Sequence, residues 1–343
     1  MSVESALYDG LGGQQVFGGD AAPSILRDLT FAPARTRRPS CIVRPQTFAQ
    51  VRAMMKVLAD YDSPVSVIGG GHGPRGVVDN APCLDLRSIP PEVTVEGTSV
   101  TINGSARVSD LLSPDSTRVV PVGVAKTPGV GLLTTGGVGG LTRSLGLSID
   151  SIEELTVINQ RGSSVRVHPE GDGDLWWAAR GAASALGVVE SVTFRTHPLE
   201  RLRETRTLTT APVLPRWLES ALSSPRSTSL SWIMAPGESS ADAYVYLVEV
   251  STSAARARSL DLVDRRDALL QETVEHPYRE FMDFSVPRIV DAAEPRGPQW
   301  ATRALWIRGE ELVNVLESLV AAVAAAPTKW CRVDFQHLDP TAA

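Results

Sequence analysis

The density of glycine between Pro121 and Leu147 is the feature that most restricts how this chain can fold. An ordinary helix is excluded there, because each interior glycine costs about 1 kcal/mol relative to alanine. Val, Leu and Thr residues are interleaved with the glycines, which argues against a disordered linker. The segment predicts backbone wrapped along a buried, extended ligand. Its glycines are Gly123, Gly129, Gly131, Gly136, Gly137, Gly139, Gly140 and Gly146.

A shorter glycine-rich segment precedes it and follows a β-branched run that ends at Ile68. Glycine lets the backbone approach a ligand closely, and free amides can point at phosphate oxygens. A tight turn with no ligand is the alternative for this segment taken alone. A Rossmann site is excluded: residues 71–76 fit G-x-G-x-x-G, but Pro74 interrupts the pattern and no helix follows. Two glycine-rich segments can together hold opposite sides of one dinucleotide.

Four motifs, in order, make residues 36–200 resemble the flavoproteins of the vanillyl-alcohol oxidase superfamily. The similarity is greatest to the berberine-bridge-enzyme-like group, whose FAD-binding domain is of the PCMH type. The motifs are Arg44–Val51, Gly69–His72, Val120–Gly123 with Gly136–Asp150, and Asp174–Gly181 with Leu186–Val189.

The resemblance implies bound FAD, and it implies that His72 is the residue that such proteins often link covalently to the flavin 8α-methyl group. Ala125 occupies the position of the second, cysteine anchor of doubly linked members, so at most one covalent link is expected. The chain is also shorter at its C-terminus than usual members. The expected cofactor-binding residues are Ile68, Gly69, Gly70, Gly71, His72, Gly73, Gly76, Pro121, Gly123, Gly129, Thr134, Thr135, Gly136, Gly137, Gly139, Gly140, Leu141, Gly187, Val188 and Val189.

The expected fold class is α+β. We expect a loosely structured lead-in at residues 1–35, a two-subdomain FAD-binding domain at 36–200, and a second α+β substrate domain with an antiparallel sheet at 201–343. Hydrophobic periodicity and capping predict helices at Thr47–Asp60, Leu175–Ala179 with Asp174 as N-cap, Ala254–Leu270 and Glu310–Ala326. Predicted strands are Pro64–Ile68, Cys83–Leu86, Val93–Ile102, Glu153–Asn159 paired with Ser164–His168, Gly187–His197, Thr228–Met234, Tyr244–Val250 and Trp330–His337.

Tyr244 and Tyr246 alternate with apolar residues along a predicted strand and so share one face. If that face is turned toward the flavin, both are candidate catalytic phenols on the substrate side. Trp176 and Trp177 are interpreted as core residues. For Arg143 and Arg180, contact with a phosphate or carboxylate and a surface ion pair remain equal alternatives.

Charge and composition restrict the partners. A net charge of −6 with no basic cluster argues against nucleic acid. No apolar run reaches the roughly 18 residues of a membrane span, and the N-terminus shows no signal peptide. Three scattered cysteines suggest reduced thiols and a cytoplasmic location, and no spacing suggests a metal site. The expected partner is a small-molecule substrate, with a homodimer as an open alternative.

Two function classes remain open. The first is a FAD-dependent oxidoreductase acting on a small organic or natural-product substrate in secondary metabolism, with dioxygen reoxidising the flavin. The second is a flavoprotein-derived cyclase of the pericyclase type, which would shape one substrate conformer without net redox. A degenerate partner subunit completed by another chain is a third alternative.

Overall fold

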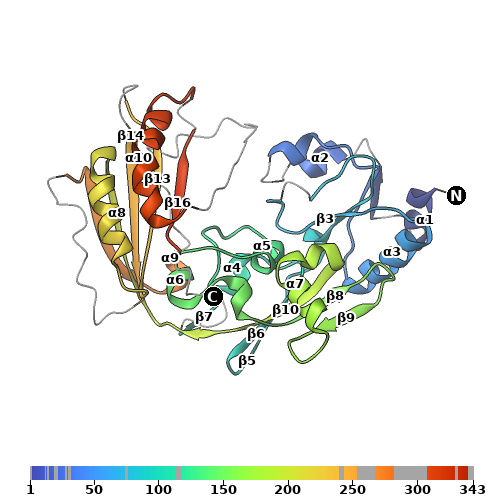
Figure 1. Ribbon diagram of the computed structural model, residues 1–343. Coiled ribbons are helices and arrows are strands. Elements are labelled where there is room, and N and C mark those ends of the chain that lie inside the picture. Colours follow the sequence, from blue (N-terminus) through green and yellow to red (C-terminus); the bar gives the residue numbers. More distant parts are fainter. Residues whose placement is uncertain are drawn as a thin grey trace.

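The computed structural model (Figure 1) describes residues 2–11, 13, 15–18, 22–27, 29, 32–73, 76–112, 117–238, 243–252, 267–281, 307–328 and 331–338. Three sheets of four or five strands organise these residues. Figure 1 shows the first sheet with its helices at the N-terminal end of the molecule, the second sheet in the middle and the third at the opposite end.

The first sheet has the order β1-β2-β4-β3, in which β4 pairs in parallel with β2 and with β3. Helix α3 (Phe48–Asp60) connects β2 to β3, as the apolar periodicity predicted, and the Thr47 side chain caps it by accepting a hydrogen bond from the Gln50 amide. Both strand predictions are confirmed, although Leu86 begins a 3₁₀ turn, η2 (Leu86–Ser88). The strands are β1 (Val16–Gly18), β2 (Cys41–Val43), β3 (Ser66–Ile68) and β4 (Cys83–Asp85).

The lead-in is part of this lobe, so the prediction of a loose segment was wrong. β1 joins the sheet by pairing antiparallel with β2. Leu7, Leu26 and Leu29 are at most 1% exposed, because they fill the two apolar clusters on either side of the sheet. The short helical segments were too brief to give a readable period. They are α1 (Val3–Gly10), α2 (Ala22–Leu26) and the 3₁₀ helix η1 (Ala32–Thr36).

The second sheet is antiparallel, with the order β5-β6-β10-β8-β9. The single strand predicted at Val93–Ile102 is instead a hairpin, because Gly97 takes a positive φ of 60° and turns the chain. The predicted pairing of β8 with β9 is confirmed. The strands are β5 (Val93–Glu96), β6 (Ser99–Asn103), β8 (Ile152–Ile158), β9 (Ser164–Val167) and β10 (Val188–Arg195).

Helix α7 (Gly173–Leu186) packs on this sheet and differs from its prediction. Its N-cap is Asp172 rather than Asp174, because the Asp172 carboxylate accepts hydrogen bonds from the amides of Asp174 and Leu175. It continues past Ala179 after a break in helical geometry at residues 180–182. Gly187 ends the helix with a φ of 151° and is not in the strand that follows.

Short elements fill the chain between β6 and β8. They are α4 (Val108–Leu111), β7 (Arg118–Val119), which pairs with β11 (His197–Pro198), α5 (Val130–Thr134), α6 (Thr142–Leu145) and the 3₁₀ helix η3 (Ser148–Ser151). The glycine-rich stretch is therefore a run of single turns and extended backbone, as its composition predicted.

The third sheet is antiparallel, with the order β15-β12-β14-β13-β16. Both strand predictions for its centre are confirmed. Of the predicted helix Ala254–Leu270, residues 253–266 lie outside the described residues, and Leu270 begins a strand instead because it pairs with Leu208. The strands are β12 (Leu202–Thr210), β13 (Thr228–Pro236), β14 (Ala243–Ser251), β15 (Leu270–His276) and β16 (Val333–Gln336).

The two faces of the third sheet have different neighbours. Helices α8 (Leu214–Leu222) and α10 (Gly309–Ala324) cover one face and bury Val245, Leu247 and Trp232. The helix prediction for α10 is confirmed, with Leu312, Leu316 and Val323 buried and Val315 exposed. Tyr246, Val248 and Val250 point to the other face and join the apolar cluster of the second sheet. Among the described residues, neither α8 nor α10 covers this second face, named the helix-free face, and residues of the single-turn helices α6 and α9 (Tyr278–Phe281) reach it.

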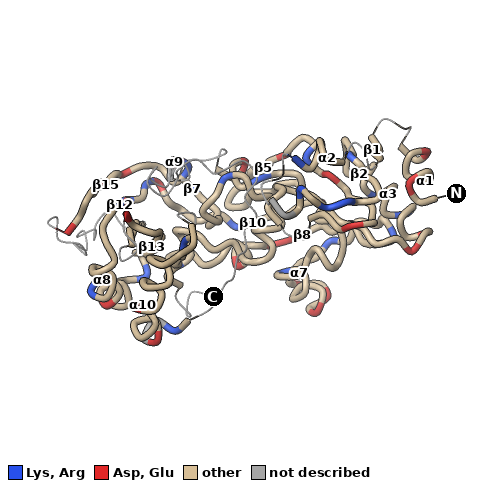
Figure 2. Tube along the Cα trace, turned by 90° about the horizontal axis from the view of Figure 1, so that it is seen from above, with Lys and Arg blue, Asp and Glu red and all other residues tan. Residues whose placement is uncertain are grey.

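Helix hydropathy, thiols and charge distribution complete the description of the fold. In the described part of the chain, no helix is long and apolar enough to cross a membrane, and no group of three His, Cys, Asp or Glu residues forms a metal cluster. Cys41, Cys83 and Cys331 are free thiols. Figure 2 shows Lys and Arg interspersed with Asp and Glu along the tube rather than gathered in one stretch.

Candidate cofactor and substrate site

The two glycine-rich segments, which the sequence predicted on opposite sides of one dinucleotide, touch each other directly at one point. A Cβ atom at Gly70 would clash with the backbone nitrogen of Gly129 and would lie 2.7 Å from the carbonyl oxygen of Thr127. A Cβ at Gly129 would lie 2.6 Å from the Gly70 nitrogen. Real Cβ contacts are not this short, so only glycine allows these two backbones to meet. The contact joins the loop after β3 to the segment that enters α5.

His72 makes a second link between the same segments. Its Nε2 atom lies 2.7 Å from the Thr127 hydroxyl oxygen. Partial burial and the nearby charge of Arg107 hold the pKa of the imidazole below its ordinary value. The ring is therefore neutral at neutral pH, with a lone pair on one nitrogen.

The longer segment is also folded tightly on itself. Gly137 has a φ of 79°, and a side chain there would overlap Ser148, whose hydroxyl donates hydrogen bonds to the carbonyl oxygens of Pro121 (2.6 Å) and Gly137 (3.2 Å). A Cβ at Gly139 would clash with the Val122 carbonyl oxygen. The backbone from 121 to 148 is thus fixed by contacts that tolerate no side chain at two of its glycines.

The loop at residues 69–73 fits a phosphate-bearing ligand. Within the described residues, its backbone amides donate no hydrogen bond to the protein. It follows the carboxyl end of a strand in the parallel part of the sheet, where ligands of α/β sheets bind. Added Cβ atoms at Gly69, Gly131 and Gly136 would meet nothing within 4 Å, so the backbone there faces open space. Free amides beside an open strip of glycine backbone are the donors that a pyrophosphate requires.

Other predicted cofactor residues can contribute only through their backbones. The side chains of Ile68, Leu141 and Val188 are at most 2% exposed and lie among other apolar residues. The hydroxyls of Thr134 and Thr135 donate to carbonyl oxygens within α5, at 3.2 Å and 2.7 Å. Gly187 approaches Ile158, and the Val189 carbonyl contacts Gly104. Pro121, Gly123, Gly71, Gly73, Gly76 and Gly140 lie in the loops described above.

The helix-free face of the third sheet carries the two predicted phenols. Tyr246 pairs in register with Leu208 and Ile233, and Tyr244 with Thr210 and Ala235. Tyr246 is 3% exposed, and this burial raises its pKa. It is therefore a neutral phenol, which can donate a hydrogen bond but is a poor general base.

A charged network on the same face was missed at the sequence level. The Glu204 carboxylate, which is fully buried, accepts hydrogen bonds from Arg206 at 2.7 and 2.9 Å. It also lies 2.8 Å from Nε2 of His276. The only available signal was the alternation of Glu204 and Arg206 on β12, because His276 is distant in the sequence.

The predictions for the tryptophans and arginines had mixed outcomes. Trp177 is 80% exposed, so its interpretation as core was wrong, because α7 turns that side chain to solvent. Trp176 is half-buried with the Arg180 guanidinium over its ring. Arg180 also pairs with Asp150 at 3.6 Å. Arg143 is only 4% exposed, and it donates hydrogen bonds to the Ser224 hydroxyl and to the carbonyl oxygen of Thr228, the first residue of β13.

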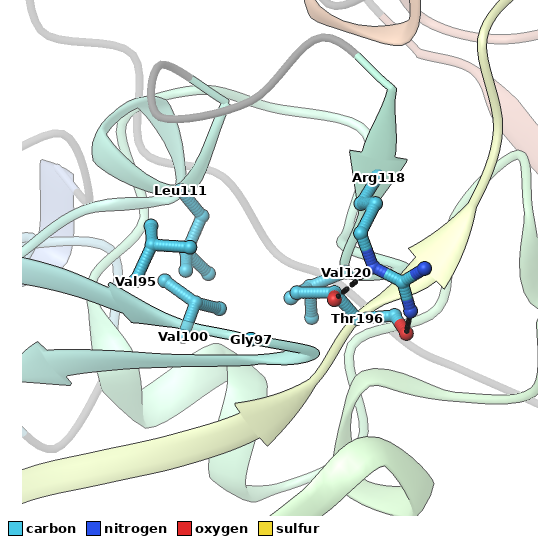
Figure 3. Close-up of a pocket in the computed structure, with 7 residues that line it drawn as sticks. All are labelled: Val95, Gly97, Val100, Leu111, Arg118, Val120 and Thr196. Carbon is cyan, nitrogen blue, oxygen red and sulfur yellow. Dashed lines mark hydrogen bonds between the residues drawn. The ribbon is translucent and has the colours of Figure 1, made fainter.

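A small cavity lies away from these residues. Figure 3 shows it between the β5–β6 hairpin and Arg118, which donates hydrogen bonds to the Thr196 hydroxyl (2.8 Å) and carbonyl (2.6 Å). Its volume of about 20 Å³ admits one water molecule. None of the predicted site residues lines it, so it is not the substrate site.

The part of the chain that holds both glycine-rich segments defines its class. Residues 39–168 match the family described as FAD binding domain. This range contains the Gly70–Gly129 contact and the His72–Thr127 pair, which are the features suited to a dinucleotide. The chain therefore carries a FAD-binding domain, and FAD is its cofactor.

Curated relatives narrow the class. The chain is 36% identical over 169 residues to the FAD-linked oxidoreductase sorD of Penicillium rubens. This match covers 47% of this chain and 36% of that protein. It is 30% identical over 186 residues to (R)-6-hydroxynicotine oxidase of Paenarthrobacter nicotinovorans, covering 51% and 40%. The chain thus matches well under half the length of these relatives.

Solved structures agree in fold. BBE-like 1 of Physcomitrella patens superimposes with a TM-score of 0.74 at 19% identity, covering 95% of this chain and 75% of that one. The 6-hydroxy-D-nicotine oxidase of Arthrobacter nicotinovorans gives 0.69 at 22% identity, covering 79% and 63%. These neighbours confirm the α+β fold class, with an antiparallel sheet domain after the first two sheets.

Proposed function

We propose that this chain is a FAD-linked oxidoreductase of the berberine-bridge-enzyme-like type, acting on a small organic or natural-product substrate in secondary metabolism. The contact between Gly70 and Gly129 is the observation that carries this proposal. It brings two glycine-rich backbones together, and within the described residues the amides of residues 69–73 donate no hydrogen bond to the protein. The relatives named FAD-linked oxidoreductases, from fungi among others, support the redox class.

Residues of the first two sheets would hold the cofactor. The amides of residues 69–73 suit the pyrophosphate, and the open glycine backbone at 131 and 136 leaves room along it. His72 is the proposed single covalent anchor, since Ala125 offers no nucleophile. Bound FAD would supply a two-electron acceptor for substrate oxidation.

The helix-free face of the third sheet is the proposed substrate side. Tyr244 and Tyr246 occupy that face, and the Glu204–Arg206–His276 network lies further along it. Tyr244, which is only partly buried, would orient a substrate oxygen or nitrogen through a hydrogen bond, whereas Tyr246 is a neutral phenol that packs in the apolar cluster of the second sheet. The fixed charges of the network set the polarity of this face.

The visible spectrum of the purified protein tests the proposal. We expect flavin absorbance, and we expect it to bleach anaerobically with a substrate from a set of small alcohols and cyclic amines that includes (R)-6-hydroxynicotine. Protein that stays colourless after reconstitution with FAD would refute the oxidoreductase assignment. Conversion of a substrate at unchanged mass, without oxygen and without bleaching, would establish the cyclase alternative instead.

Acid precipitation tests the covalent anchor separately. Wild-type protein should keep its flavin in the precipitate, whereas His72→Ala should release it. Mass spectrometry should find no second attachment in either protein, because residue 125 is alanine. Equal release from both proteins would show that the flavin is held without a covalent bond.

A further inference from the structure

We propose that the Thr127 hydroxyl fixes the orientation and tautomer of His72, so that Nδ1 is the ring nitrogen that bonds the flavin. This inference rests on the covalent anchor proposed above and names the residue that prepares it. Thr127 is a positioning residue: it acts through His72.

The geometry comes from the junction of the two glycine-rich segments. His72 follows Gly70 by two residues, and Thr127 precedes Gly129 by two residues. Because the Gly70 and Gly129 backbones are in contact, the two side chains leave the same junction and meet at 2.7 Å. The glycine contact thus sets the distance between imidazole and hydroxyl.

The Thr127 hydroxyl can donate or accept a hydrogen bond, so two tautomers of His72 fit this contact; in the proposed one the ring carries its hydrogen on Nε2. Nε2 faces the Thr127 oxygen, and within the described residues Nδ1 has no hydrogen bond. When Nε2 carries the hydrogen and donates it to Thr127, the lone pair is on Nδ1. Burial and the charge of Arg107, which pairs with Gly129 in a short antiparallel bridge, favour the neutral ring. A neutral imidazole with a fixed lone pair is a competent nucleophile.

The attachment balances as an oxidation of the flavin methyl group. A bond forms between Nδ1 and the 8α carbon, and one C–H bond of that carbon breaks. The carbon and the imidazole each lose one hydrogen, as two protons and two electrons overall. The electrons pass to the isoalloxazine and from there to dioxygen, which leaves as hydrogen peroxide. Thr127 takes no part in the redox balance: the hydrogen that the imidazole loses is the one on Nε2, which leaves to solvent as a proton once Nδ1 is bonded.

Thr127→Val is the informative variant, because it keeps the shape of the side chain and removes the hydroxyl. Apoprotein would be mixed with FAD in air, and covalent flavin would be followed by fluorescence of the acid precipitate. We expect the rate of attachment to fall at least about tenfold while non-covalent FAD binding persists. Thr127→Ser should restore a rate near that of wild type. Thr94→Val, on an exposed strand position, is the matched control and should attach flavin normally.

Nitrogen NMR of the wild-type apoprotein provides a test that needs no variant to fold. His72 should show the Nε2–H tautomer, and the Nδ1–H tautomer would overturn the inference. A Thr127→Val protein that attaches flavin at the wild-type rate would overturn it as well, as would wild-type protein that binds FAD without attaching it. Failure to bind FAD at all would instead refute the proposed function, so the two failures are distinguishable.

Discussion

The cofactor junction and the junction between the second and third sheets are built in opposite ways. At the cofactor junction, the Gly70 and Gly129 backbones touch directly. At the other junction, apolar side chains of both sheets share one buried cluster, and single polar side chains add hydrogen bonds across it. Arg143 on α6 donates hydrogen bonds to the Ser224 hydroxyl (2.7 Å) and carbonyl (3.1 Å), and to the carbonyl oxygens of Pro225 (3.2 Å) and Thr228 (2.6 Å).

Tyr278, on the short helix α9 (Tyr278–Phe281), makes the second reaching contact. Its hydroxyl lies 3.4 Å from the Val122 nitrogen and 3.5 Å from the Val122 carbonyl oxygen. The difference indicates which of the two junctions tolerates amino-acid substitution. A contact between two backbones cannot adjust to an added side chain, because no side-chain torsion is available to relieve the overlap. A long side chain that reaches across a junction can be replaced at a limited loss of folding free energy.

Gly70→Ala should have the largest effect. The new Cβ would overlap backbone atoms of residues 127–129, which cannot move aside as a side chain would. We expect destabilisation of about 3 kcal/mol or more, together with loss of FAD binding. Denaturant titration and flavin absorbance measure the two effects. Gly10→Ala, whose Cβ would meet nothing within 4 Å, is the control. If Gly70→Ala retains FAD binding, the backbone contact at the cofactor junction is not as intolerant of substitution as described.

Arg143→Met should have the next largest effect, because it leaves carbonyl groups at the start of β13 without their buried donor. We expect a loss of about 2 kcal/mol and faster hydrogen exchange in residues 224–228. Arg166→Met is the matched control, since that side chain is 70% exposed and pairs with Glu154 at the surface. Equal loss of stability in both variants would show that the junction is not specially dependent on Arg143.

Replacement of Tyr244 and Tyr246 by Phe tests the helix-free face. The rings and their burial are kept, so the fold should survive. We expect turnover to fall at least about tenfold in an oxidoreductase that uses these hydroxyls, which matches the lower range for positioned proton donors and acceptors. Unchanged turnover would show that neither hydroxyl is catalytic and would favour catalysis by shape alone.

Tyr278→Phe should have the smallest effect. Its hydroxyl is buried, but both distances to Val122 are long for hydrogen bonds. We expect a loss of about 1 kcal/mol or less, read from the shift in the denaturant midpoint. Tyr8→Phe, at a position that is 52% exposed, is the control. A loss as large as that of Arg143→Met would rank Tyr278 as the main link between the sheets.

The cofactor lobe could be predicted from the sequence because glycine density and strand patterns are local signals. They placed both segments, helix α3 and strands β3, β4 and β8–β10. The hairpin at Gly97 was missed because a single glycine can lie within a strand or form a turn. The cap at Asp172 was missed because both Asp172 and Asp174 have side chains that can cap a helix.

The partners of Arg143, Tyr278 and His276 could not be predicted. Each contact joins residues more than 70 positions apart, and neither partner carries a periodic pattern. Thr127 was missed for the same reason, although it stands inside a segment that the sequence singled out. Its importance depends on a meeting with His72 that only the folded backbone creates.

The glycine strip also indicates where this protein can be re-engineered. The backbones of Gly70 and Gly129 are in direct contact, so a library of variants at these positions would destabilise the fold before it changed which flavin is bound. Gly69 and Gly131 face open space and do not have a positive φ, so they can accept a methyl group. A methyl group at either position would extend into this open space without touching the Gly70–Gly129 contact. A designer seeking acceptance of a trimmed or altered flavin would begin there.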